Sequence, residues 1–252
     1  MGDLIPTNID DFIEYFLRNS LQVDILDYQK VESGGEGYTI IYVSGLSEIQ
    51  TEVLESIGFE QIKDDLWIFY GFEVNVDKLR DSAIWYFEDL QRVKWMTLIK
   101  LRCYIDNSIF GECRVSMFNT THESLEIAFK WFGTIAIDEL SFRSFVIEFA
   151  HLFLEDLRND VQQAIKDIFG KNNYLNLFRC LRNCYAHKRI KENEENIVNE
   201  YVRSIVGVNR HELSEWHQFL TIQIQIIDDC INFLRELLGR VDEIVEKIHS
   251  KT

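Results

Sequence analysis

Arg182 and His187 are the residues whose types and spacing best suit chemistry on an anionic substrate. They lie in a cationic stretch, from Lys171 to Lys191, that has six basic residues and no Asp or Glu. The whole chain has 26 basic and 42 acidic residues and a formal net charge of −16. A cationic stretch in so acidic a chain predicts a local site for an anionic ligand. Its basic residues are Lys171, Arg179, Arg182, Lys188, Arg189 and Lys191.

An Arg and a His together suit the cleavage of RNA without a metal ion. In that reaction the ribose 2′-OH loses a proton, the phosphorane is stabilised and the 5′-oxygen gains a proton. A His side chain can move these protons because its unperturbed pKa of about 6.5 lies near working pH. Arg182 could bind the phosphorane because a guanidinium stays charged and grips two oxygens. Asn183 could donate to a phosphate or orient the imidazole of His187.

The spacing of these residues restricts how they can meet. On a helix, Asn183 and His187 lie at i and i+4 on one face. Arg182 and His187 diverge by about 140°, since each residue turns the helix by about 100°. They can therefore converge only if the helix ends or bends near Tyr185-Ala186, or if a second subunit completes the site.

The hexad from Arg182 to His187 resembles the R-x(4–6)-H signature of the HEPN superfamily, in the form in which Asn follows the Arg. HEPN proteins are small helical bundles, and many are metal-independent ribonucleases. The resemblance covers roughly residues 120–250. It implies catalytic roles for Arg182, Asn183 and His187, no cofactor, and a homodimer in which two motifs face each other across a cleft.

Four further basic residues are expected to bind RNA. Lys188, Arg189 and Lys191 would lie beside the cleft and bind flanking phosphates. Arg179 belongs to the same cationic stretch and is assigned the same role. Arg189 stands two residues after His187, where one HEPN subgroup has a tyrosine that a partner nucleotidyltransferase modifies. Regulation by that route is therefore not expected.

The resemblance implies an endoribonuclease that acts as a toxin or as an effector of defence against phage, with an antitoxin or a defence-complex protein as a further partner. The alternative is a non-catalytic HEPN-like dimer whose acidic surface docks a basic partner. In that case Arg182 would form a structural ion pair and His187 would be buried. A third hypothesis is a helical adaptor whose C-terminal helix binds another protein's helix.

A zinc site is a competing interpretation of the same stretch. Cys180, Cys184 and His187 lie at i, i+4 and i+7, but their Cα atoms would span about 10.5 Å, which strains convergence on one ion. Both thiols are expected to be buried as small apolar groups. Glu148 and His151, or Glu155 and Asp156, could offer carboxylates to the site, but on a long helix they are expected on its solvated face. His211 and His217 are expected on the surface or at a helix cap.

The predicted fold class is α+β and predominantly helical, with a small N-terminal α/β module in residues 1–119. A β-α-β-β-α-β order there would be that of a ferredoxin-like unit. Ser47 and Gln50 form a capping box before the first helix of this unit. The expected strands are Tyr38–Val43, Phe59–Lys63, Leu66–Phe72, Thr97–Tyr104 and Phe110–Phe118. The expected helices are residues 8–18, residues 47–58 and a segment that begins near Asn75 or Asp77.

Residues 120–252 are predicted to form the HEPN-like helical bundle. The helical patterns run through Phe142–Phe169, Tyr174–Cys184 and Trp216–Ile248, and Thr120 and Glu123 form a capping box before them. The charged residues from Lys191 to Glu200 are expected to connect two helices. The last pattern would be about 50 Å long as one helix, which favours a dimer because it exceeds a small bundle.

Composition restricts the location and the mode of nucleic-acid binding. Five cysteines without a C-x-x-C pair predict a reduced, intracellular, cytoplasmic protein. Neither a signal peptide nor a membrane span is expected. The acidity excludes a general nucleic-acid coat protein, which would need a broad basic surface. Contact with RNA should therefore be local.

Overall fold

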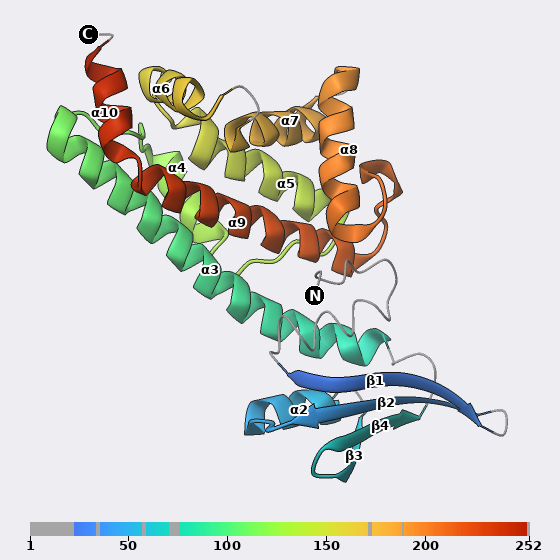
Figure 1. Ribbon diagram of the computed structural model, residues 1–252. Coiled ribbons are helices and arrows are strands. Elements are labelled where there is room, and N and C mark those ends of the chain that lie inside the picture. Colours follow the sequence, from blue (N-terminus) through green and yellow to red (C-terminus); the bar gives the residue numbers. More distant parts are fainter. Residues whose placement is uncertain are drawn as a thin grey trace. The chain divides into compact units, whose positions relative to one another are not determined.

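Short antiparallel strands come first along the chain and long helices follow, so the fold class is α+β and mostly helical (Figure 1). The computed structural model describes residues 23–33, 36–56, 59–70, 76–170, 173–187 and 189–250. The chain forms two compact units, Met1–Leu90 and Gln91–Thr252. This division falls within one helix, whereas the sequence placed a boundary after residue 119.

The N-terminal unit contains a four-stranded antiparallel sheet with the strand order β1-β2-β4-β3. In β2, Thr39, Ile41 and Val43 are buried while Tyr42 between them is exposed, as expected for a strand with one face on a core. The Ser47–Gln50 capping box forms as predicted, with Ser47 N donating to Gln50 Oε1 over 2.7 Å. The elements are β1 (Asp24–Ser33), β2 (Glu36–Ser44), α2 (Glu48–Ser56), β3 (Glu60–Lys63) and β4 (Leu66–Tyr70).

The ferredoxin-like order was wrong for two reasons. The strand β1 was missed because it lies at the sheet edge and most of its residues are polar. The residues expected as strands at 97–104 and 110–113 are instead part of the helix α3 (Val76–Cys113), and residues 114–118 follow it outside any strand. Its buried residues follow a helical spacing that prevails over the local β-branched and aromatic content. These residues are Trp95, Leu98, Arg102, Ile105 and Ile109. The helix expected at residues 8–18 lies outside the described ranges.

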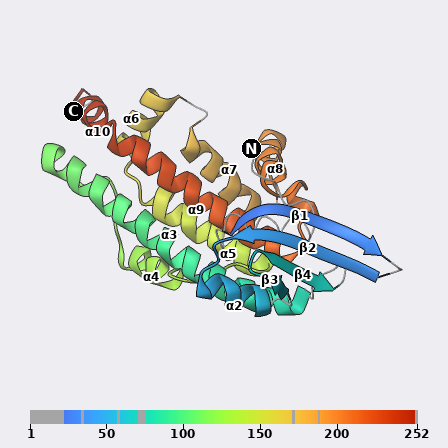
Figure 2. The same cartoon turned by 60° about the horizontal axis from the view of Figure 1, so that its bottom comes forward.

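The helices of the C-terminal unit pack around α9. In both ribbon views α9 runs beside α3, and the two are joined by an ion pair of 2.7 Å between Lys94 and Asp228 (Figures 1 and 2). No helix in the described part of the chain is long and apolar enough to cross a membrane. After α3 the unit contains α4 (His122–Lys130), α5 (Glu139–Ala150), a π-helical segment (His151–Glu155), α6 (Asn159–Phe169), α7 (Tyr174–Ala186), α8 (Glu192–Val206), a short 3₁₀ turn (Arg210–Glu212), α9 (Trp216–Leu238) and α10 (Val241–His249).

Several predicted boundaries in this unit were wrong. The pattern Phe142–Phe169 is interrupted by the π-helical segment and a loop. Residues 191–200 were expected as a connection, but nearly all of them belong to α8, which runs from Glu192 to Val206. The final pattern breaks at Gly239-Arg240, so α9 has 23 residues and the argument for a dimer from helix length no longer holds. The capping box before α4 uses Thr121 and Ser124, one residue later than predicted.

Aromatic rings join α5 and the π-helical segment to α7. The ring of Phe149 packs against those of Phe153 and Phe178, with centroids 4.7 and 5.0 Å apart. Phe142 contacts Tyr185 edge-on at 5.3 Å. Such contacts add to the burial of large apolar surfaces, so they fix α7 along its length against α5.

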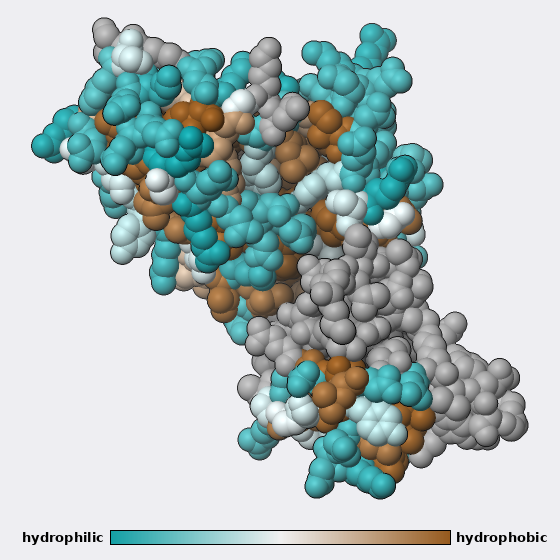
Figure 3. Space-filling view, viewed as in Figure 1, coloured by the Kyte–Doolittle hydropathy of each residue, from teal (hydrophilic) through white to brown (hydrophobic). Residues whose placement is uncertain are grey.

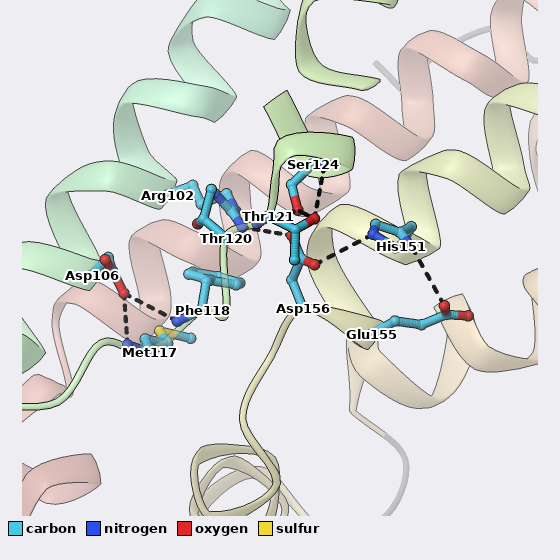
Figure 4. Close-up of polar contacts among 10 residues, drawn as sticks. All are labelled: Arg102, Asp106, Met117, Phe118, Thr120, Thr121, Ser124, His151, Glu155 and Asp156. Atoms are coloured by element: carbon cyan, nitrogen blue, oxygen red, sulfur yellow. Dashed lines mark hydrogen bonds and ion pairs between the residues drawn. The ribbon is translucent and has the colours of Figure 1, made fainter. Parts of the chain in front are cut away.

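A buried ion pair anchors the end of the π-helical segment (Figure 4). Arg102 Nη2 lies 2.9 Å from Asp156 Oδ2, with side-chain exposures of 10% and 4%. The Arg102 guanidinium also lies 4.2 Å from the ring centre of Phe118. Burial lowers the pKa of Arg102, and the charge of Asp156 opposes that effect. Neither charge is stable there without the other.

Replacing Arg102 by Ala should therefore destabilise the protein by about 3–5 kcal/mol, because it leaves the Asp156 carboxylate buried without its counter-ion. The exposed Arg143 on α5 is a matched control, and Arg143→Ala should change stability by about 0.5 kcal/mol or less. Urea denaturation of the three proteins measures both effects. Equal midpoints for the two variants would contradict this role of the ion pair.

Candidate functional site

The helix α7 ends at Ala186, inside the Arg182–His187 hexad. His187 N still donates to Asn183 O over 3.1 Å, but the His187 backbone is extended, with φ −114° and ψ 144°. Of the two ways left open for the pair to converge, the end of the helix near Tyr185-Ala186 is therefore the one that this chain has. Because the chain leaves the helical path there, the His187 ring can turn toward Arg182 within one chain.

Arg210, which follows α8, stabilises this helix end. Its Nη1 lies 3.5 Å from Cys184 O, one of the carbonyls that the helix leaves without a partner, and its guanidinium lies 5.4 Å from the Tyr185 ring centre. Glu195 in the first turn of α8 holds Arg210 at 3.4 Å. Sequence analysis missed Arg210, because no local pattern links it to a carbonyl 26 residues away.

Arg182 and His187 meet at this end of α7. Arg182 Nη1 lies 3.3 Å from His187 Nε2, and the His187 side chain is exposed. A guanidinium has only donors, so a hydrogen bond between the two requires a lone pair on Nε2, which is that of a neutral imidazole with its proton on Nδ1. While this hydrogen bond is made, Arg182 occupies that lone pair.

Glu155 at the end of the π-helical segment is the second partner of Arg182. Its Oε1 lies 2.9 Å from Arg182 Nη2, and the two side chains are 41% and 33% exposed. Glu155 is exposed, as expected, and it also contacts the motif, which is the alternative that the sequence left open. Glu148, the other carboxylate considered, instead accepts from Trp131 Nε1 over 2.5 Å and does not join the motif.

The π-helical segment positions Glu155 by inserting an extra residue into the helical path, a feature frequent at functional sites. Figure 4 shows His151 between Glu155 and Asp156, with its ring nitrogens 3.6 and 3.5 Å from their carboxylate oxygens. Because Asp156 pairs with Arg102, a chain of polar contacts runs from the core to Arg182. Asp156 is buried rather than solvated, which corrects the expectation for it.

Asn183 contacts Glu194 and Arg182, whereas the roles considered for it were donation to a phosphate and orientation of the imidazole. Its Nδ2 lies 3.3 Å from each carboxylate oxygen of the buried Glu194 on α8. Its Oδ1 lies 3.4 Å from Arg182 Nη1. Asn183 therefore connects Arg182 to α8, and it does not contact the His187 ring directly.

The remaining basic residues lie on α7 and on the connection to α8. Arg179 is exposed and donates to Asn176 Oδ1 over 2.6 Å. Arg189 and Lys191 are exposed, and Lys191 immediately precedes α8. Lys188 falls outside the described ranges. The described cations are thus near the Arg182–His187 pair along the chain, and no ion pair joins them to a carboxylate of the described residues.

The other sulfur and imidazole groups do not converge with His187. Cys180 and Cys184 are buried in the core, and burial raises the pKa of both thiols, that of Cys184 to about 11. His187 is exposed, so the three do not share a face and the zinc interpretation was wrong for them. His211 is exposed as expected, whereas His217 is buried and burial lowers its pKa.

Comparison of the chain with protein-family models, with curated proteins and with solved structures found no match. The resemblance of the hexad to the HEPN signature therefore stands on the motif alone. What the geometry adds is the convergence of a neutral imidazole, a guanidinium and exposed cations at one helix end.

The protonation pattern of His187 is directly testable. In the wild type at neutral pH, the His187 ring should carry its proton on Nδ1, because Arg182 donates to Nε2. The Arg182→Ala variant should lose this preference. Nitrogen-15 NMR of the imidazole distinguishes the two tautomers, and the exposed His249 serves as an internal reference. Identical His187 signals in both proteins would show that the contact does not persist in solution.

Proposed function

We propose that this chain is a metal-independent endoribonuclease of the HEPN type, whose helical unit is a HEPN-like bundle. The observation that carries the proposal is the 3.3 Å approach of Arg182 Nη1 to an exposed His187 Nε2. In the cytoplasm such an enzyme would serve as a toxin or as an effector of defence against phage. An antitoxin or a defence-complex protein would then be its partner.

In the proposed reaction, a phosphate first draws Arg182 Nη1 away from His187 Nε2, which frees the lone pair of Nε2. His187 Nε2 then takes the proton of the ribose 2′-OH, and the 2′-oxygen attacks the adjacent phosphorus. Arg182 stabilises the charge that develops on the phosphorane oxygens. The bond from phosphorus to the 5′-oxygen then breaks, which leaves a 2′,3′-cyclic phosphate. The 5′-oxygen takes a proton from an imidazolium, and in a homodimer His187 of the partner subunit would provide it.

Glu155 must leave Arg182 before the reaction can begin. Before RNA binds, the carboxylate holds Arg182 beside His187, and a phosphate must displace it to receive both guanidinium nitrogens. The pair is partly exposed, so it contributes only about 0–1 kcal/mol. A phosphodiester carries the same single charge but can contact two guanidinium nitrogens, so it can displace Glu155 at little cost.

Local cations support binding of RNA by an otherwise acidic protein. Arg179, Arg189 and Lys191 are exposed around the pair, so they can neutralise phosphates on either side of the cleaved bond. Figure 3 shows mainly hydrophilic residues over α8, and the first turn of that helix, which contacts the end of α7 through Glu194, is acidic. Repulsion from these carboxylates would direct RNA toward the exposed cations of α7.

A non-catalytic interaction protein remains the second candidate, and the ion pair between Arg182 and Glu155 favours it. That function would make Arg182 structural, with the acidic surface of the chain binding a basic partner. It also expects a buried His187, and the exposure of His187 disagrees with that expectation. Catalysis is therefore the better supported proposal.

Purified protein should cleave mixed cellular RNA in EDTA and leave 2′,3′-cyclic phosphate and 5′-hydroxyl ends. Arg182→Ala and His187→Ala should each lower the cleavage rate by about a hundredfold or more, because each removes a group that stabilises the transition state. The matched controls Arg143→Ala and His249→Ala, at exposed positions, should cleave like the wild type. Melting temperatures verify that all variants are folded. Cleavage that requires Mg²⁺ would refute the mechanism.

Glu155→Gln should raise the affinity for RNA by up to about fivefold, since it releases Arg182 from an ion pair worth at most about 1 kcal/mol. Glu246→Gln on α10 removes the same charge at an exposed position and should raise affinity much less. Fluorescence anisotropy with single-stranded RNA measures both. Unchanged affinity together with a large loss of stability would instead favour the structural role of the ion pair.

A further inference from the structure

A polar cleft of about 350 Å³ lies between α6 and α7, beside the Arg182–His187 pair. None of the described residues that line it is acidic, although the chain as a whole has 42 acidic residues. Its walls are formed by five amides and two cations, and its floor by two leucines. The residues are Asn159, Gln162, Gln163, Lys166, Asn173, Asn176 and Arg179, with Leu154 and Leu175.

The amides of this cleft are arranged in two ridges. On α6, Asn159, Gln163 and Lys166 follow one another at i, i+4 and i+7, and therefore share one face. On α7, Asn176 and Arg179 are one turn apart. An amide offers both donors and an acceptor, which is the combination that pairs with the edge of a nucleobase. The two cations add a place for phosphate, and the leucines add apolar surface for the ring.

Part of this hydrogen-bonding capacity is already used within the protein. Gln162 Nε2 donates to Leu154 O and Leu157 O, which fixes the side chain and leaves its oxygen as an acceptor. Gln163 Nε2 donates to Asp167. The exposed Asn159 side chain bonds to no residue in the described ranges, so it can bond to a ligand.

The cleft is continuous with the proposed catalytic centre in two ways. Arg179 precedes Arg182 by one helical turn, a rise of about 4.5 Å along α7. Leu154 in the floor precedes Glu155, which holds Arg182 at 2.9 Å. A strand whose phosphate lies at Arg182 can therefore place an adjacent nucleotide in the cleft.

We infer that this cleft binds one unpaired nucleotide of an RNA strand next to the cleaved bond. Its amides contact the base edge, and Lys166 and Arg179 contact the phosphate. The inference rests on the proposed function and deepens it by naming the substrate class. Single-stranded RNA follows from the chemistry, because the edges of a paired base are not free to enter a cleft of amides.

The test is binding of short single-stranded RNAs, each of one base type, to the cleavage-deficient His187→Ala protein by fluorescence anisotropy. One base should bind about fivefold or more tightly than the others, as expected from one amide–base contact. Adding Asn159→Ala and Gln163→Ala should remove that preference. Adding Lys166→Met should weaken the binding of all four RNAs. It should also lower the slope of log affinity against log salt concentration by about one.

Matched controls are Asn107→Ala and Lys100→Met, both at exposed positions of α3. Equal affinity for all four bases, or amide variants that behave like Asn107→Ala, would overturn the subsite. The proposed function can fail separately. A base preference that depends on Asn159, without cleavage by the wild type, would support the subsite and refute the nuclease. Cleavage that stays unchanged when Asn159→Ala and Gln163→Ala are made in the wild-type protein would support the nuclease and refute the subsite.

Discussion

The helix α7 ends at Ala186, and the rest of the site depends on that termination. Had the helix continued, Arg182 and His187 would point about 140° apart. The extended His187 backbone instead allows its ring to approach Arg182 to 3.3 Å. Arg210 binds the freed Cys184 carbonyl, while Asn183 and Glu194 connect the helix end to α8. A helix end that is held from several sides can keep two side chains in fixed geometry.

The two ion pairs at this segment differ in strength and have different roles. The buried pair of Arg102 and Asp156 anchors the π-helical segment, and breaking it would leave a charge without a partner. The pair of Arg182 and Glu155, at the same end of that segment, is partly exposed and readily exchanged. The scaffold therefore stays fixed while Arg182 remains free to change partners when an anion arrives.

Much of this site could be predicted where the deciding interactions are local. The bounds of α7 and the need for a helix end follow from the periodicity and spacing of one short segment. Glu155 and Arg210 could not be found in this way, because they reach the motif through the fold and not through the sequence. The same limit explains residues 97–113, where β-branched and aromatic residues indicated strands. There, the packing of a buried helical face from Trp95 to Ile109 favours a helix over strands.

The central claim is that Arg182 and His187 act as one catalytic unit, and a double-mutant cycle of the RNA cleavage rate in EDTA tests it most directly. Residues that act in the same transition state are strongly non-additive. The account predicts that Arg182→Ala/His187→Ala cleaves RNA about as slowly as either single variant. Losses that multiply in the double variant, as for two independent groups, or a wild type that cleaves no RNA, would contradict it.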